Sequence, residues 1–330
     1  MARSPINLGS GGALLDLRSF GRGAKVSLTP RQARTIAQTV RRAPEVMVKV
    51  SGGARTLAGV QQHFAYIGRD GELGVEVDHG FNLAGRNSAK KLALDWDLDL
   101  VAHRRQDERS ITGKRRSPKL VHNLIFSMPP GTPAKKVLGA VRKLAVNEFA
   151  LQHRYALVLH TDEAHPHVHL VVKAESEQGV RLNIRKATLR HWREQFAENL
   201  RELGIAANAT ERAVRGEVRT PKKDGIYRAA QRGESTRQMQ EVQNLRERVP
   251  GSVRRFTRGV ETLHRTRTAV VAGWNAIARQ LKEAGACELA KDVDRFVERM
   301  APPTPDQMQL IHEFRSRSDH RRIDPMERTR

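Results

Sequence analysis

The chain has 330 residues with 59 Lys or Arg against 36 Asp or Glu, so its formal net charge is +23 and its pI is about 11.1. This excess predicts attraction to polyanions, nucleic acid ahead of an anionic membrane surface. No apolar run approaches the roughly 20 residues that span a bilayer, and the Gly- and Ser-rich start does not resemble a secretory signal. The single cysteine, Cys287, excludes internal disulfides and fits a reducing compartment. We therefore expect a cytoplasmic protein without stable membrane insertion.

Residues 1–44 predict a basic, partly disordered N-terminal extension with a short basic helix around residues 31–36. A domain over residues 45–215 follows. It opens with a strand at 46–50, an amphipathic helix at 57–67 and an alternating strand at 73–77. The polar, basic stretch at 103–119 is too charged for a core and predicts a loop.

The second half of this domain carries stronger patterns. Strands are predicted at residues 119–127, 154–160 and 166–173, and helices at 133–150 and 187–203. The short turn at 161–165 predicts that the last two strands are hairpin neighbours. This order indicates an α+β fold with a mostly antiparallel sheet flanked by helices.

Residues 216–330 differ in character, because charged residues dominate and strand patterns disappear. Helical patterns at 260–281 and 289–300 predict a mainly helical, basic C-terminal region. Its last residues, 315–330, form an Arg-rich tail that is either a solvated, disordered segment or a segment read by a partner.

Four histidines and an aspartate lie within residues 160–169. Alternation in a strand puts His167 and His169 on one face, and His160 ends the strand before. Three imidazoles on a rigid sheet can hold a divalent metal and leave positions open for substrate, with Asp162 orienting an imidazole or accepting a proton. Imidazole suits Zn, Mn, Fe or Ni. The alternative is that these histidines only cap a strand and satisfy one another.

A nucleophile is harder to find. Of the three tyrosines, Tyr155 lies in an apolar strand and Tyr227 in the polar region after the domain. Tyr66 ends the helix at 57–67, where its neighbour Ile67 is the better core candidate, so we expect Tyr66 to face outward. A lone helical tyrosine more often packs than reacts, so this position alone indicates nothing.

Together, three segments resemble the ordered motifs of relaxases, the mobilisation nucleases of conjugative plasmids, in the branch that includes the T-DNA border endonuclease. They are Tyr66-Ile67-Gly68-Arg69, Ile125-Phe126-Ser127-Met128-Pro129 and His160-x-Asp162-x-x-x-x-His167-x-His169. The resemblance spans roughly residues 45–205. It implies a histidine-hydrophobe-histidine nuclease fold with a five-stranded antiparallel sheet, and a strand-specific nick at an origin of transfer.

The resemblance also implies a role for each residue of the motifs. Tyr66 would attack the scissile phosphate and become joined to the DNA 5′ end, and Asp162 would tune a histidine or take the tyrosyl proton. The metal ligands would be His160, His167 and His169, with Mg²⁺ or Mn²⁺ as the expected ion. Ser127 would contact DNA near the cut.

Several cations near the motifs are candidates for tracking the phosphate backbone; ordinary solvated charge is the alternative for each. The candidates are Arg69, Arg154, Lys173 and Arg185, with Arg181 and Lys186 beside them. The resemblance further implies accessory nicking proteins, a type IV secretion coupling protein, and transport with the DNA into a recipient cell.

Two other interpretations stay open. The run from His165 to Val172 also resembles the histidine-triad nucleotide hydrolases, which are small and metal-independent and would leave the +23 charge and Tyr66 unexplained. A nonenzymatic DNA-binding protein with a structural histidine cluster would account for the charge alone. His165 is an extra histidine that the motif does not require, so the ligand set is open by one residue.

Overall fold

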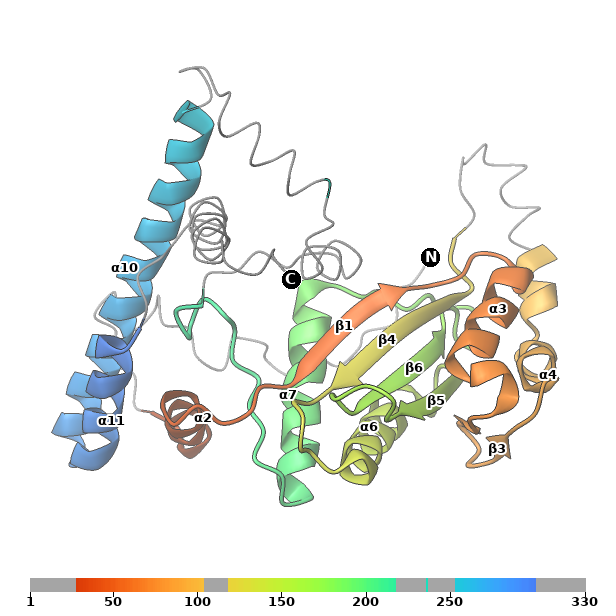
Figure 1. Cartoon of the computed structure of the whole chain (residues 1–330), viewed down its shortest axis with the longest axis horizontal. Coiled ribbons are helices and arrows are strands. Elements are labelled where there is room, and N and C mark those ends of the chain that lie inside the picture. The colour runs from red at the N-terminus through yellow and green to blue at the C-terminus, as the bar shows by residue number, and fades with distance from the viewer. Residues whose placement is uncertain (1–27, 104–117, 218–235, 237–252, 301–330) are drawn as a thin grey trace, which may run out of the picture. The chain divides into compact units, whose positions relative to one another are not determined.

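The computed structural model describes residues 28–103, 118–217, 236 and 253–300. These residues belong to two units, with residues 42–209 in the first and residues 28–41 and 210 onward in the second (Figure 1). The predicted disorder at the N-terminus, most of the predicted loop at 103–119, Tyr227 and the Arg-rich tail lie outside the described residues. The predicted domain boundaries after residues 44 and 215 stay predictions.

The first unit is built on a six-stranded sheet in the order β1-β4-β6-β5-β2-β3. Its strands are β1 (Met47–Gly52), β2 (Val75–Val77), β3 (Asn82–Leu83), β4 (Val121–Ser127), β5 (Tyr155–His160) and β6 (His167–Lys173). Every pairing is antiparallel, which confirms the predicted α+β class. The expected count of five strands is wrong by one. The extra strand, β3, has only two residues and cannot show an alternating pattern.

Helices cover both faces of this sheet. On one face, α6 (Ala134–Phe149) and α7 (Lys186–Glu202) pack on Leu124, Phe126, Val168 and Leu170. On the other face, α3 (Leu57–Ile67) and α4 (Ser88–Asp95) pack on β2, β5 and part of β6. The strands in Figure 1 lie between these two helix pairs, so β6 is central and both of its faces are buried.

Helix α3 begins and ends where its sequence predicts. The Thr56 side chain accepts a hydrogen bond from the Gly59 N–H at the N-terminus, and Gly68 follows the last helical residue. Val60, Phe64 and Ile67 recur at spacings of three and four and are fully buried. Tyr66 lies between two of these core positions in sequence and therefore points away from the core.

The chain turns sharply directly after α3. Arg69 and Asp70 both adopt positive φ angles, 49° and 53°, which are uncommon for residues other than glycine. Gly71 has φ 97°, and a Cβ there would lie 2.3 Å from the Gly85 carbonyl carbon. This tight turn fixes the direction in which the Arg69 side chain leaves the end of α3.

The second unit consists of helices α2 (Pro30–Val40), α10 (Val253–Glu283) and α11 (Cys287–Glu298). Its core holds Ile36 of α2, Trp274 of α10 and Phe296 of α11. The helices predicted around residues 31–36, 260–281 and 289–300 are confirmed. Among the described helices, none combines the length and the apolar character that crossing a membrane requires.

Candidate metal centre and nuclease site

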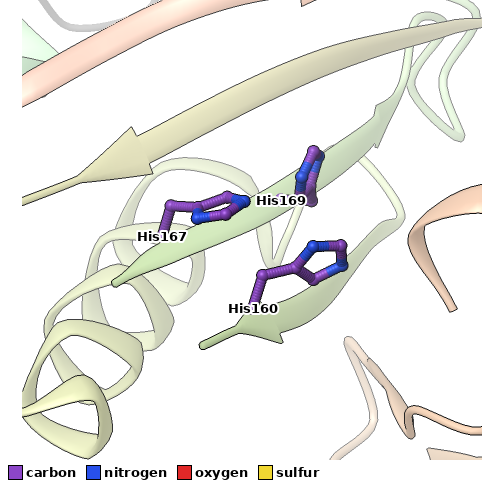
Figure 2. A group of neighbouring side chains, drawn as sticks. All are labelled: His160, His167 and His169. Carbon is purple, nitrogen blue, oxygen red and sulfur yellow. The ribbon is translucent and has the colours of Figure 1, made fainter. Parts of the chain in front are cut away.

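Strands β5 and β6 bring three histidines together at one end of the sheet. The antiparallel register places His160 opposite His167 and Val158 opposite His169. The three imidazoles converge on the same side of the strands (Figure 2). One ring nitrogen from each lies within 4.8 Å of the others, so the predicted juxtaposition of the three histidines is confirmed. Val168, between the two β6 histidines, packs on the opposite face with α6 and α7.

Backbone carbonyls fix two of the imidazoles. His160 donates its Nε2–H to the Ile67 carbonyl oxygen at 2.7 Å, and His167 donates its Nδ1–H to the His165 carbonyl oxygen at 3.0 Å. Since a carbonyl only accepts, these bonds leave His160 Nδ1 and His167 Nε2 with free lone pairs. His165 therefore contributes its backbone here, while its own side chain is exposed.

The donor set fits a divalent metal ion. The ring centroids are separated by 5.1, 4.6 and 5.3 Å, and an ion bound about 2.1 Å from each nitrogen fits among rings at this spacing. The Nδ1 atom of His169 is buried without a hydrogen-bond partner in the described structure. A ligating imidazole usually has a hydrogen-bond partner on its second nitrogen, so this atom bears on how the His169 ring is oriented and not on the metal itself.

Burial also favours the neutral form of two of these imidazoles. It lowers the pKa of His169 to about 3, with smaller contributions from His160 and His167, and it lowers the pKa of His160. Neutral imidazole is the form that binds metal, so His160 and His169 need no proton release near pH 7. Because the group contains no carboxylate, the charge of a bound cation would stay available to attract a phosphate.

The candidate nucleophile lies on the helix that touches this cluster. Tyr66 is 64% exposed, which confirms that it faces outward, whereas Tyr155 is 3% exposed in the core. Its neighbour Ile67 supplies the carbonyl that holds His160. An exposed tyrosine on the helix that contacts the cluster is accessible to a polymeric substrate.

Arg69 and Asp162 connect Tyr66 to the histidines. The Arg69 guanidinium carbon lies 5.6 Å from the centre of the Tyr66 ring, and the same guanidinium pairs with the Asp162 carboxylate. Asp162 Oδ1 is in turn 3.8 Å from His160 Nδ1. The first and third sequence motifs therefore meet in space, as catalysis by Tyr66 and Asp162 requires.

Ser127, from the second motif, also borders the cluster. It ends β4 directly opposite His167, and Ile125 lies opposite His169. The Ser127 side chain is 8% exposed. All three motifs of the sequence thus come to one end of the sheet, although the contact of Ser127 with DNA stays a prediction.

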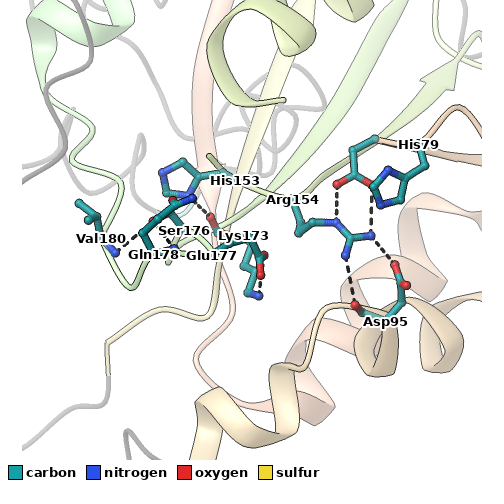
Figure 3. Close-up of polar contacts among 10 residues, drawn as sticks. His79, Asp95, His153, Arg154, Lys173, Ser176, Glu177, Gln178 and Val180 are labelled. Carbon is teal, nitrogen blue, oxygen red and sulfur yellow. Dashed lines mark hydrogen bonds and ion pairs between the residues drawn. The ribbon is translucent and has the colours of Figure 1, made fainter. Parts of the chain in front are cut away.

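The other predicted DNA contacts have different surroundings. Arg154 is held by Asp78 and Asp95, and the buried Lys173 pairs with Glu177 at 3.0 Å (Figure 3). Lys173 is also at the far end of β6 from His167, roughly 20 Å away at about 3.3 Å per residue. These contacts favour structural roles for Arg154 and Lys173, and their contact with DNA stays untested. Arg185 is exposed at the N-cap of α7.

One residue of the site is missing from the sequence-based prediction. The His63 ring, on α3, lies 6.4 Å from the His169 ring, centroid to centroid, in an edge-on arrangement. Its sequence signal is weak: His63 precedes Tyr66 by three positions and therefore shares its side of the helix. Only the packing of α3 on the sheet reveals the proximity of His63 to His169.

Comparison with known proteins finds a similar family for part of the chain. Residues 72–205 match the family model described as a relaxase, MobA/VirD2-like, nuclease domain. This range contains the three histidines and Ser127, and Tyr66 lies before it. No solved structure matches the chain significantly.

Three curated relatives carry the name T-DNA border endonuclease VirD2. The protein from Agrobacterium fabrum (strain C58) is 26% identical over 209 residues, 59% of this chain and 46% of the relative. The protein from Rhizobium radiobacter is 26% identical over 191 residues, 54% of this chain and 44% of the relative. The chain spans less than half the length of these relatives. Residues 72–205 are therefore similar to the nuclease domain of MobA/VirD2-like relaxases, and the chain resembles the VirD2 endonucleases at 26% identity.

Proposed function

We propose that this protein is a DNA relaxase that nicks one strand at an origin of transfer and pilots that strand during conjugative transfer. One observation carries the proposal: three histidines converge beside the helix end that presents an exposed tyrosine. A cation site and an accessible hydroxyl are the two parts that a metal-dependent transesterase needs.

In the proposed reaction, Tyr66 is the nucleophile. Its phenolic oxygen forms a bond to the scissile phosphorus, and the bond from phosphorus to the 3′ oxygen breaks. The products are a 5′-phosphotyrosyl link and a free 3′ hydroxyl, which receives the proton that tyrosine loses. The phosphodiester energy is retained in the link, so the strand can be rejoined by reversal.

The surrounding residues divide the remaining work. His160, His167 and His169 would hold Mg²⁺ or Mn²⁺, which supplies Lewis-acid stabilisation of charge on the phosphate oxygens when bound. Asp162 accepts the tyrosyl proton, and Arg69 holds the phenol and the incoming phosphate together. Ser127 contacts the strand beside the cut.

The partners of the protein would be accessory nicking proteins and a type IV secretion coupling protein. The coupling protein would bind the C-terminal region in the bacterial cytoplasm.

The decisive experiment uses single-stranded oligonucleotides from the transfer region of the element that encodes the protein. With Mg²⁺ or Mn²⁺, the wild-type chain should form a covalent adduct that survives denaturation in a gel. Tyr66→Phe should abolish the adduct and keep DNA affinity within about twofold, since only the attacking oxygen is lost. Tyr155→Phe is the matched control, because it removes a phenol that is buried in the core on the opposite face of the sheet.

The outcomes separate the proposal from its alternatives. A DNA-binding protein without enzymatic activity would give no adduct with either chain. A histidine-triad hydrolase would act on nucleotides without added metal and would not respond to Tyr66→Phe. An adduct that persists in Tyr66→Phe would assign the nucleophile elsewhere and overturn the proposed role of this tyrosine.

A further inference from the structure

Each imidazole that binds a metal has a second nitrogen, and its hydrogen bond sets the tautomer and aims the ring. In the histidine cluster two of these second nitrogens are satisfied by backbone carbonyls, those of Ile67 and His165. The third histidine differs. His169 Nδ1 is buried and has no hydrogen-bond partner in the described part of the chain.

The neighbouring side chain, that of His63, has a nitrogen in the same condition. His63 Nε2 is also buried without a hydrogen-bond partner among the described residues. The two rings are neighbours, with centroids 6.4 Å apart and planes at 62°. Two buried, partnerless imidazole nitrogens on adjacent rings suggest a shared partner, because either one alone costs about 1–3 kcal/mol.

We infer that His63 is the positioning partner of His169: His169 Nδ1–H donates to one water, and that water donates to His63 Nε2. A direct bond would need the two nitrogens about 3 Å apart and the centroids roughly 5 Å apart, closer than they are. One bridging water fits the wider separation. The inference rests on the proposed function in taking His169 Nε2 as the ligand atom.

The electrostatics agree with an accepting His63. Burial lowers its pKa, so the ring is neutral near pH 7 and one of its nitrogens carries a lone pair. His63 is not placed as a fourth ligand. Its ring is farther from His169 than the 4.6 to 5.3 Å that separate the three clustered rings.

The bridge would tie the nucleophile's helix to the metal centre at two points. His63 and Ile67 lie one turn apart on α3, and each touches a different histidine of the cluster. Tyr66 lies between these two contacts in sequence. His63 thus fixes the aim of His169 and, through the same helix, the height of Tyr66 above the sheet.

The experiment compares three variants of the full chain. His63→Leu removes the acceptor at similar volume, and His63→Gln keeps an accepting oxygen. Gln62→Leu is the matched control, because it is the same kind of change at an exposed neighbouring position of α3. Mn²⁺ affinity is measured by calorimetry. The tautomer of His169 is measured by ¹⁵N NMR in the metal-free protein, and thermal melting confirms that each variant folds.

We expect His63→Leu to weaken Mn²⁺ binding by about 10–100-fold, as loss of such partners typically does, and to convert His169 from the Nδ1–H form to a mixture of tautomers. His63→Gln should bind within about threefold of wild type, and Gln62→Leu should match it. Equal losses in His63→Leu and His63→Gln, or an unchanged tautomer in His63→Leu, would overturn the inference. The NMR measurement decides the question even if the wild-type chain binds no Mn²⁺, a result that would count against the proposed function instead.

Discussion

The two ends of strand β6 carry polar clusters of opposite character. At the His167 end, imidazole nitrogens converge with free lone pairs, and one buried nitrogen lacks a partner within the described structure. At the Lys173 end, Lys173 pairs with Glu177, and Arg154 on β5 pairs with Asp78 and Asp95. Satisfied charges hold a fold together, whereas buried groups that await a partner mark a place where something binds.

The contrast matters because the sequence alone treats both ends alike. Arg154 lies just before the histidine motif in the sequence and Lys173 lies just after it, so both are expected near the histidines. Antiparallel pairing, however, puts Arg154 beside Lys173 and both a full strand length from His167. The following predictions would break or sharpen this distinction between an end that binds and an end that stabilises.

The largest effect should follow from removing the histidines. The double variant His167→Ala, His169→Ala should lose measurable Mn²⁺ binding and reduce adduct formation by about 10³-fold, since a bound cation contributes several kcal/mol to a phosphoryl transition state. Calorimetry and gel assays of the adduct provide the two measurements. Full activity in this variant would refute the metal assignment and remove the distinction between the two ends.

Next in size is the loss of the buried ion pairs at the other end. Arg154→Met should lower the free energy of unfolding by about 3 kcal/mol, because it leaves Asp78 buried without its cation. Mn²⁺ affinity should not change. Arg142→Met is the matched control: its pair with Glu76 is more exposed, so the expected loss is below about 1 kcal/mol. Denaturant unfolding measures both.

A stable Arg154→Met variant with weakened DNA binding would give the opposite result. It would indicate that Arg154 contacts the DNA backbone, as its position in the sequence suggested. It would also show that a cation with two carboxylate partners can still bind DNA.

A smaller effect is expected from pH. Burial, followed by the charges of Lys119, Arg181 and His153, lowers the pKa of His122 to about 4. Between about pH 6.5 and pH 4 the unfolded chain therefore protonates His122 and the folded chain does not. The stability of the folded chain relative to the unfolded chain is therefore unaffected by His122 above about pH 6.5 and falls as the pH falls toward 4. His122→Gln should recover on the order of 2 kcal/mol of that acid loss.

Urea unfolding at pH 7 and pH 4.5 measures this effect, and His79→Gln, at an exposed position, is the control. If His122→Gln lost as much stability on acidification as the wild-type chain, the sensitivity would belong to the other buried histidines, those of the cluster included.

The smallest effect on the fold should come from Asp162→Asn. Its pair with Arg69 is substantially exposed, so the free energy of unfolding should not change measurably. Adduct formation should still fall about tenfold, because the carboxylate near His160 Nδ1 and Arg69 is lost. Glu163→Gln, in the same turn, is the control. A loss of stability that matched the loss of activity would place Asp162 with the structural ion pairs.

The sequence predicts the elements that follow regular patterns. Spacings of three and four located α3 through Val60, Phe64 and Ile67, and alternation located His167 and His169 on one face of a strand. These patterns succeed because burial acts on every turn of a helix and every second residue of a strand. Strand β3 has no such period, and only its pairing with β2 defines it.

The partners of individual side chains are harder to predict. Nothing near Arg154 in sequence indicates Asp78 or Asp95, since those contacts depend on how β2 and α4 lie beside β5. His63 is hidden for the same reason: its neighbour His169 is on another element. The local pattern of a sequence thus predicts which face a residue occupies, and the tertiary fold alone determines what that face meets.

The alternation of β6 has a consequence for how this protein can lose its activity. Val168, between the two histidines, is part of the apolar core on the opposite face. Deleting one residue of the strand would exchange its two buried faces and turn histidines into the core under α6 and α7, so a one-residue deletion would remove the cluster and disrupt the fold together. Inactive descendants that keep this fold should therefore carry point substitutions at the histidines, with the length of the strand preserved.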